Sequence, residues 1–380
     1  MKSNRKTKTI ILIILGVLFT VLPIFTINSN LKNSSFSDSI NLDNTNLKSS
    51  KVSAPIHIDD ANPSMNWSIA ESMGICTGNG TYSEPYVIED LVIDAGGSGS
   101  CIFINNSDVY FKIENCTFYN GDIRLESVSN GLLINNKVTS NNGGYGIYLY
   151  YSNNNMISEN TANYNFKGIY LESSNNIEIS GNILEYNDFS GIELYGSNNN
   201  TISGNTANNN DWGIYLDSSI NNTISGNIAS NDITTNQYYG IFLRNNCDDN
   251  TISGNTANYN VDDGIHLEYS DNNTVSENTA NNNGDRGIFL YYSHNNLISG
   301  NSANNNEIGI RLSHGNNNTI SGNTLIGNNE CIIEEDCQGN VFENNDCEGR
   351  DEIIPGYNLF FLLGILSIVT IILNKKFKKS

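Results

Sequence analysis

Six ionisable side chains of the kinds used in acid–base catalysis occur on successive copies of a sequence repeat, the last two within one copy. These side chains are Glu172, Glu193, Asp217, Arg244, His266 and Glu268. Hydrolysis of a glycosidic bond needs two carboxyl groups, about 5–5.5 Å apart for retention or about 6.5–9.5 Å apart for inversion. Elimination from a uronic acid needs a base beside groups that neutralise a carboxylate. Either chemistry requires a fold that brings distant parts of the chain together.

The repeat that carries these residues is the motif Gly-Ile-x-Leu, which occurs eight times between Gly146 and Leu312 at intervals of 22 to 27 residues. On a β-strand the Ile and the Leu point to one side, and the residue between them points to the other. The Ile and the Leu never change, whereas the residue between them varies from Tyr to Glu, His and Arg. The pattern indicates an inward apolar pair beside an outward position.

A second apolar column and a column of small or apolar residues follow the motifs. Their members are Ile157, Ile179, Ile202, Ile224, Ile252, Val275, Ile298 and Ile320, and then Ala162, Leu184, Ala207, Ala229, Ala257, Ala280, Ala303 and Leu325. Four inward residues per repeat cannot close a core alone, but stacked repeats can. Frequent Asn, Gly and Ser exclude helical repeats. A disordered, low-complexity chain would have no reason to keep Ile and Leu in register.

The sequence therefore predicts an all-β fold, a parallel β-helix of about 10–11 coils with about 22–23 residues each. Like residues of successive coils would lie about 4.8 Å apart. A column of asparagines from Asn160 to Asn323 is expected to form side-chain hydrogen bonds from coil to coil.

Five segments are predicted along the chain. Residues 1–27 form a signal peptide or signal anchor, 28–54 a flexible spacer, 55–100 an N-terminal cap and leading segment, 101–352 the coils with a Cys-rich C-terminal cap, and 353–380 a transmembrane or sorting segment with a basic tail. Basic residues flank the apolar run at each end, which places both termini on the cytoplasmic side and the coils outside the cell. We expect hydrophobic helices at both termini that anchor the protein in the membrane.

The charge favours the cell exterior. The net charge is −21, and residues 28–356 contain 11 basic and 40 acidic residues. A strongly acidic surface argues against nucleic acid as a partner. It suits hydration or the loose binding of cations such as calcium, whereas no cofactor and no defined metal site is expected.

The cysteines and the asparagines give two further expectations for an exported chain. Cys76, Cys101 and Cys116 fall near the first coil, and Cys331, Cys337 and Cys347 fall near the last. We expect disulfides that staple these two ends, although the pairing cannot be deduced from the sequence. Nine Asn-x-Ser/Thr sites would accept glycans outside the cell and make the protein a glycoprotein.

The repeat GIYL-xxSxNN-TISGNT resembles the right-handed parallel β-helix repeats of the NosD-like and CASH (carbohydrate-binding and sugar hydrolase) group over residues 75–347. The resemblance implies the fold but no single activity, because this scaffold carries lyases, hydrolases, epimerases and plain surface rods. For NosD it implies copper delivery, but the four histidines here lie in no ligand spacing. Pro355-Gly356-Tyr357 with the following apolar run resembles archaeal Pro-Gly-Phe sorting signals, with Tyr in place of Phe.

The outward positions around each Leu combine aromatic rings with charged groups. The predicted sugar-binding rings are Tyr148, Tyr170, Tyr195, Tyr215, Phe242, Phe289 and Tyr291. Such rings can stack on sugars while nearby carboxylates bond to hydroxyl groups, but stacked aromatic residues also simply stabilise a sheet. Glu172 and Asp217 would lie about 9.6 Å apart across two coils. Asp262-Asp263-Gly264-Ile265-His266 is similar to the aspartate motifs of polygalacturonases, although the further motifs of that family are absent.

The sequence predicts a membrane-anchored extracellular surface protein, a structural or adhesin-like module that binds carbohydrate on its aromatic face. Its partners would be extracellular glycans or other surface proteins. The alternative is a polysaccharide lyase, hydrolase or epimerase that uses the patch of Glu172, Glu193 and Asp217 or the patch of Arg244, His266 and Glu268. The short turns favour the first interpretation, since catalytic β-helices usually build groove walls from longer insertions.

Overall fold

The computed structural model describes residues 51–140, 143–232 and 236–347. The predicted signal segment 1–27, most of the spacer and the segment 353–380 lie outside the described residues. Within the described ranges, no helix combines the length and the apolar character that a membrane crossing requires.

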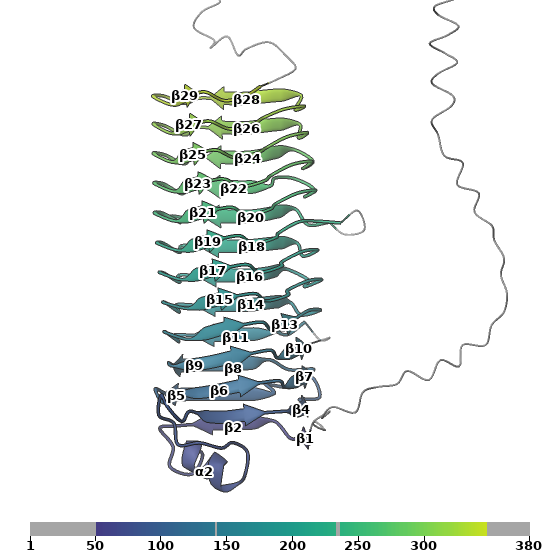
Figure 1. Ribbon diagram of the computed structural model, residues 1–380, viewed down its shortest axis with the longest axis vertical. Helices are drawn as coiled ribbons and strands as arrows, with labels where there is room; N and C mark the ends of the chain where they lie inside the picture. Colours follow the sequence, from purple (N-terminus) through teal and green to yellow (C-terminus); the bar gives the residue numbers. More distant parts are fainter. Residues whose placement is uncertain (1–50, 141–142, 233–235, 348–380) are drawn as a thin grey trace, which may run out of the picture. The chain divides into compact units, whose positions relative to one another are not determined.

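The described chain is a parallel β-solenoid in which each coil adds one strand to each of two long sheets (Figure 1). The first long sheet, sheet B, holds the Gly-Ile-x-Leu motifs. In order, its strands are β2 (Ile56–Asp59), β5 (Ile102–Ser107), β8 (Ile123–Val128), β11 (Ile147–Tyr150), β14 (Lys167–Glu172), β16 (Ser190–Tyr195), β18 (Trp212–Asp217), β20 (Tyr239–Arg244), β22 (Ile265–Glu268), β24 (Arg286–Tyr291), β26 (Ile308–Ser313) and β28 (Glu330–Glu335). These 12 strands make about eleven turns, as the repeat predicted.

The second long sheet, sheet C, holds the Thr-Ile-Ser segments, and a third side carries the short sheet A. The strands of sheet C are β3 (Tyr86–Glu89), β6 (Phe111–Glu114), β9 (Gly131–Ile134), β12 (Met156–Ser158), β15 (Glu178–Ser180), β17 (Thr201–Ser203), β19 (Thr223–Ser225), β21 (Thr251–Ser253), β23 (Thr274–Ser276), β25 (Leu297–Ser299), β27 (Thr319–Ser321) and β29 (Val341–Glu343). Those of sheet A are β1 (Lys51–Ser53), β4 (Leu91–Asp94), β7 (Thr117–Tyr119), β10 (Lys137–Thr139) and β13 (Thr161–Ala162). Beyond β13, isolated bridges continue the third side as far as Asp346.

The first coil begins earlier than the sequence suggested. Strand β1 pairs with β4, so Lys51–Ser53 belong to the solenoid and not to the spacer predicted for residues 28–54. The short helix α2 (Trp67–Ser72) lies at this end (Figure 1), and Asn66 caps it by accepting a hydrogen bond from the Ile69 N–H. Trp67 is buried and stacks on Tyr86. This segment covers the apolar end of the stack, as an N-terminal cap must.

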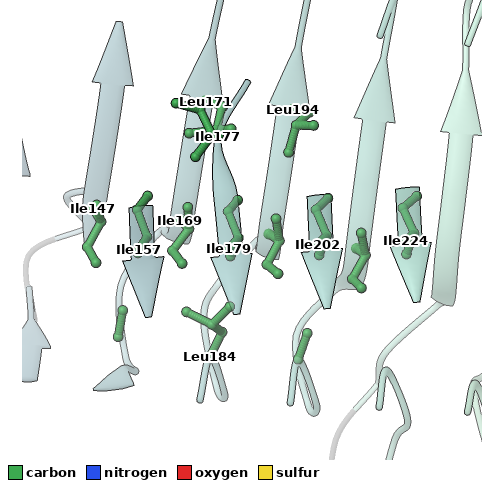
Figure 2. Packing of buried hydrophobic residues seen from close by; sticks show 14 of the residues in the cluster. Ile147, Ile157, Ile169, Leu171, Ile177, Ile179, Leu184, Leu194, Ile202 and Ile224 are labelled. Atoms are coloured by element: carbon green, nitrogen blue, oxygen red, sulfur yellow. The ribbon is translucent and has the colours of Figure 1, made fainter. Parts of the chain in front are cut away.

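The core consists of the columns that the sequence predicted. Figure 2 shows Ile147 and Ile169 from sheet B facing Ile157 and Ile179 from sheet C, with Leu184 on the third side. All of these side chains are fully buried. Each inward residue therefore contacts its equivalents above and below as well as the other two sides, which gives one continuous apolar core.

Buried asparagines connect the coils at the corners. Asn182 is almost fully buried, and its backbone N–H and side-chain Nδ2 both donate to Oδ1 of Asn205 at 2.9 Å. Nδ2 also donates to the carbonyl of Ile157 in the preceding coil. The predicted Asn column is confirmed from Asn160 to Asn323. Two further ladders, which contain Asn200 and Asn187, were not predicted.

The motif glycines are required by the close approach of successive coils. A Cβ atom on Gly213 would lie 2.5 Å from the Gly240 carbonyl oxygen and 2.8 Å from Cβ of Ala229. It would therefore overlap the backbone of the next coil. Any side chain at this position would push the two coils apart and break their hydrogen bonds.

The cysteines behave differently at the two ends. Cys331 and Cys347 form a disulfide, which confirms a staple in the last coil. Cys76, Cys101 and Cys116 are free and buried, so the predicted staple at the first coil is wrong. These thiols fill core positions as small apolar residues do, and burial raises the pKa of each to about 11.

Replacement of Gly213 by Ala is expected to lower the free energy of unfolding by about 1–3 kcal/mol because the added methyl group meets fixed backbone. Gly204→Asn is the matched control. Gly204 has a φ of +63° and open space around it, a conformation that Asn accepts more readily than most residues. Urea denaturation of both variants measures the difference, and equal losses would contradict the steric explanation.

Loss of the disulfide should loosen the last coil first. Cys331→Ser removes a link that closes a sequence separation of 16 residues, which is worth about 3 kcal/mol. Because a solenoid is stabilised between neighbours, amide exchange should accelerate in β28 and stay unchanged in β14. Cys337→Ser, at a free thiol of the same coil, should leave both strands protected. Uniform acceleration along the chain would argue against a local staple.

Candidate functional site

The outer face of sheet B carries a continuous central column, formed by the residue between the Ile and the Leu of each motif. By strand register its members are His57, Phe103, Arg124, Tyr148, Tyr170, Glu193, Tyr215, Phe242, His266, Phe289, Arg311 and Ile333. Neighbouring rings stack along the column. The centroids of Tyr148 and Tyr170 lie 5.1 Å apart, and those of His266 and Phe289 lie 4.7 Å apart. The predicted rows of aromatic rings are therefore present.

The rings of the central column are nevertheless covered, which the sequence did not predict. Only 8% of Tyr170, 6% of Tyr215 and 4% of Phe242 is exposed. Such rings offer their edges to solvent and have no free face on which a sugar could stack. Burial, as the first cause, raises the pKa of Tyr170 and Tyr215, in line with hydroxyl groups beside carboxylates. The central column forms the floor of the site.

The residue before each glycine covers this floor. Lys167 places Nζ 3.8 Å from the ring centroid of Tyr170, and Trp212 packs against Tyr215 at 4.4 Å. If side chains alternated regularly along the strand, the residue two positions before each inward Ile would also point inward. A Cβ on Gly168, however, would meet the buried corner at Asn187 and the carbonyl of Ala162, so Gly168 and the adjacent Ile169 both face inward. The break in the pleat at the glycine turns the preceding side chain outward.

The residue after each Leu forms a second column at the edge of sheet B, which we call the rim column. Its central members are Tyr150, Glu172, Tyr195, Asp217, Arg244, Glu268 and Tyr291. Tyr195 is 48% exposed, and Arg244 is exposed as well. Arg244 Nε lies 3.4 Å from Glu268 Oε2, and the Asp217 carboxylate accepts a hydrogen bond from the Tyr215 hydroxyl. The rim column therefore presents accessible aromatic and charged groups, one per coil.

The predicted triplet of Glu172, Glu193 and Asp217 is divided between the two columns. Glu172 and Asp217 lie in the rim column two coils apart, as predicted. Glu193 lies in the central column, is 5% exposed, and contacts Lys167 Nζ through Oε1 at 2.7 Å. Burial raises the pKa of Glu193 despite this lysine. A carboxylate held this way stabilises the floor and is not accessible to a polysaccharide.

The second predicted patch centres on His266, which the structure places in a closed cluster. His266 Nδ1 lies 3.1 Å from Oδ2 of the fully buried Asp263, and the ring packs between Phe242 and Phe289. Both ring nitrogens are shielded from solvent, and neither has a well-aligned hydrogen bond among the described residues. A general base must come within hydrogen-bond reach of its substrate proton. His266 does not meet this condition in the observed conformation.

Arg286 completes the cluster and was not recognised in the sequence. Its guanidinium contacts Asp263 at 3.3 Å, Asp285 at 2.6 Å and Asp262 at 3.9 Å. The three carboxylates lie close enough together to hold a metal ion, and they form the one such group among the described residues. The guanidinium already supplies the positive charge, so a calcium ion would have to displace it. The aspartate motif is therefore explained by an internal ion-pair network.

Two family descriptions match overlapping parts of the chain. Residues 74–229 match the right handed beta helix region, and residues 187–357 match the periplasmic copper-binding protein NosD. No curated protein sequence matches the chain. The description of the second family is consistent with a place outside the cytoplasm.

Solved structures share the fold at low sequence identity. The A-module of the Azotobacter vinelandii mannuronan C-5 epimerase AlgE4 has a TM-score of 0.54 and 14% identity, over 74% of this chain and 91% of that one. A mutant of the periplasmic alginate epimerase AlgG has a TM-score of 0.51 and 16% identity, over 77% and 84%. The Dettilon tailspike protein has a TM-score of 0.52 and 16% identity, over 67% and 60%. At such identities the similarity shows the fold alone.

The residues do not fit the copper that the NosD description names. Copper sites are built mainly from imidazole and sulfur ligands. His266 is enclosed by aromatic rings, while His294 Nδ1 accepts the backbone N–H of Asn316. The one candidate metal group among the described residues contains three carboxylates and no His or Cys. The match to the right handed beta helix region, together with the parallel strand order, confirms the right-handed parallel β-helix that the resemblance of the repeat implied.

Proposed function

We propose that this chain is an extracellular surface protein that binds carbohydrate chains along the rim column without turning them over. The observation that carries the proposal is the rim column itself, in which Tyr195 and Arg244 stand exposed on a rigid sheet beside the carboxylates of Asp217 and Glu268. Carbohydrate sites typically combine an aromatic surface with a few polar groups that fix the orientation of the ligand. The apolar runs at both ends of the sequence, which lie outside the described residues, are proposed to anchor the protein in the membrane.

The floor beneath the rim supports binding because it is already ordered. Lys167 and Glu193 are paired and mostly buried, with side-chain exposures of 11% and 7%. The ring of Tyr170, which lies 3.8 Å from Lys167 Nζ, is only 8% exposed. A ligand that contacts the rim therefore meets a surface whose shape is fixed in advance, and little conformational entropy is lost on binding.

The similar solved structures fit this proposal in one respect. Two of them are named as epimerases of mannuronan or alginate, and a third is a tailspike. Their names connect the fold with carbohydrate and with surface exposure. We propose the same ligand class here, with other surface proteins as further partners.

A polysaccharide-active enzyme remains the second candidate because of one observation. Arg244 and Glu268 lie beside Tyr215, Asp217 and the buried His266 on consecutive coils. An outward shift of His266 would bring a base next to these groups. The enclosed position of its ring nitrogens favours binding over catalysis.

A glycan array with the full chain tests the proposal. We expect retention of acidic and neutral polysaccharides, weakened about tenfold in Tyr195→Ala and Arg244→Ala, since loss of one aromatic or charge-assisted contact is worth about 1.4 kcal/mol. Tyr259→Ala, with 55% exposure outside sheet B, is the matched control.

The same samples are assayed for turnover with and without calcium. New reducing ends or unsaturated uronate absorbance, abolished in Arg244→Ala, would establish the enzyme instead. Equal binding by all variants would contradict the rim column as the site.

The floor gives a separate prediction on pH. Lys167→Met leaves the Glu193 carboxylate buried without its partner, which should lower the free energy of unfolding by about 3–5 kcal/mol at pH 7. Because burial raises the folded-state pKa of Glu193 above its ordinary value of 4.5, the loss should shrink as the pH falls through that raised pKa and should be nearly absent below 4.5.

The double variant Lys167→Met/Glu193→Gln provides the control. It removes both charges and should recover most of the stability at pH 7. Unfolding curves at pH 7 and pH 4 measure the effect, and a pH-independent loss in the single variant would show that the ion pair is not the cause.

A further inference from the structure

A hollow of about 520 Å³ opens at the corner between sheets B and C, beside strands β5, β8 and β11. Its lining includes Asp108, Ser127, Ser129, Tyr151, Asn153 and Asn154. The hollow lies outside the central column and the rim column. Its volume falls within the range of pockets that hold small ligands and corresponds to about one or two sugar rings.

Small residues occupy most of the corner positions that follow a rim residue, with Asn106 and Ser127 at the hollow and Ser173, Gly196, Ser218 and Asn245 beyond it. Asn106, Ser127 and Tyr151 each follow a rim residue and adopt a positive φ, of 56°, 56° and 47°. Farther along the same corner, Tyr269, Tyr292 and His314 stack on one another at 5.0 and 4.4 Å and fill the space. At Asn106 and Ser127 no ring is present, and the exposed ring of Tyr151 borders the hollow.

Several polar groups that line the hollow have no partner. Among the described residues, the Asp108 carboxylate, the Ser127 hydroxyl and the Asn154 amide form no side-chain hydrogen bond. Asn153 uses Oδ1 to accept from the backbone and side chain of Asn175, which leaves its Nδ2 free. The hollow thus offers acceptors and donors together, which is the pattern that a hydroxyl-rich ligand satisfies.

Hydrogen bonds hold the base and one wall of the hollow in place. Ser107 Oγ accepts a hydrogen bond from Trp67 Nε1 at 2.8 Å and donates to Asp60. The Val128 backbone N–H donates to Ser152 Oγ at 3.1 Å. Tyr151 is 54% exposed, and its ring contacts that of Tyr150 at 4.3 Å in a T-shaped arrangement. An exposed, supported ring beside free polar groups is suited to stack on a sugar.

The charge around the hollow selects against acidic ligands. No lining residue is basic, and Asp108 contributes a carboxylate. A uronate would therefore meet repulsion and no counter-charge. A neutral sugar would meet no such repulsion, and its hydroxyl groups can donate hydrogen bonds to the carboxylate.

We propose that this hollow binds the neutral end of an oligosaccharide. One pyranose ring stacks on Tyr151, its hydroxyl groups donate to Asp108, and Asn153 and Asn154 donate to its ring or hydroxyl oxygens. The proposal rests on the proposed function only for the class of ligand, since the hollow and the rim column share no residue.

Saturation-transfer NMR and titration of the full chain test the site, with cellobiose, maltose, lactose and chitobiose as neutral probes and a diuronate as the acidic probe. We expect at least one neutral probe to bind and the diuronate not to bind. Tyr151→Ala should weaken binding about tenfold, and Asp108→Asn should weaken it several-fold. Ser127→Tyr should abolish binding, because a ring at this position fills the gap as Tyr269 and Tyr292 do at the same corner.

The controls separate this site from the rim column. Tyr164→Ala removes an equally exposed ring elsewhere and should have no effect. Binding that survives Ser127→Tyr, a preference for the diuronate, or the absence of binding by every neutral probe would overturn the proposal. Disaccharide binding that is lost in Tyr195→Ala but kept in Tyr151→Ala would assign it to the rim column instead. Binding lost only in Tyr151→Ala would support this site even if the rim column binds nothing.

Discussion

The fold depends on the hydrogen bonds that hold one coil in register with the next. Buried ladder asparagines such as Asn205 are bonded both to their equivalents in the next coil and to a carbonyl of the preceding one. A slip of one residue would leave these amides buried without partners and turn the inward isoleucines to solvent. The longest interval between motif glycines, 27 positions from Gly213 to Gly240, shows the tolerance of this rule, since Trp212 still pairs with Tyr239. Extra residues are accepted at a corner and not within a strand.

Register also decides what the surface can do, because it places like positions above one another. In the central column, rings one coil apart stack closely enough to cover each other, and cations such as Arg124 sit over the ring of Tyr148. The same stacking that stabilises the sheet removes these faces from solvent. A ligand is therefore expected to contact the exposed residues of the rim column and of the corners, where the rings are not covered by their neighbours. The central column, which holds five of the seven predicted sugar-binding rings, is for this reason the less accessible of the two columns.

The periodic part of the molecule could be predicted, and its departures from periodicity could not. Ile, Leu and Asn at fixed spacing specify the coils, their number and one of the three ladders. The sequence did not reveal that Lys167 covers the central column. The outward direction of Lys167 depends on a break at Gly168 in the regular alternation of inward and outward side chains along the strand. Arg286 was missed because its partners, Asp262 and Asp285, come from two different coils. The free thiols of Cys76 and Cys101 reflect core packing at the capped end, which spacing alone does not reveal.

A smooth solenoid is better suited to a polymer than to a small molecule at its rim, because every coil presents one rim residue at a constant interval. Single contacts at exposed residues such as Tyr195 are weak, but a chain that touches several coils at once gains from their high effective concentration. The corner hollow beside Tyr151 adds an exposed ring and polar side chains outside the rim column. A polysaccharide that runs along the rim and ends in a neutral sugar would use the two kinds of contact differently. The rim residues of successive coils would supply avidity, while the corner hollow would supply selectivity for the chain end.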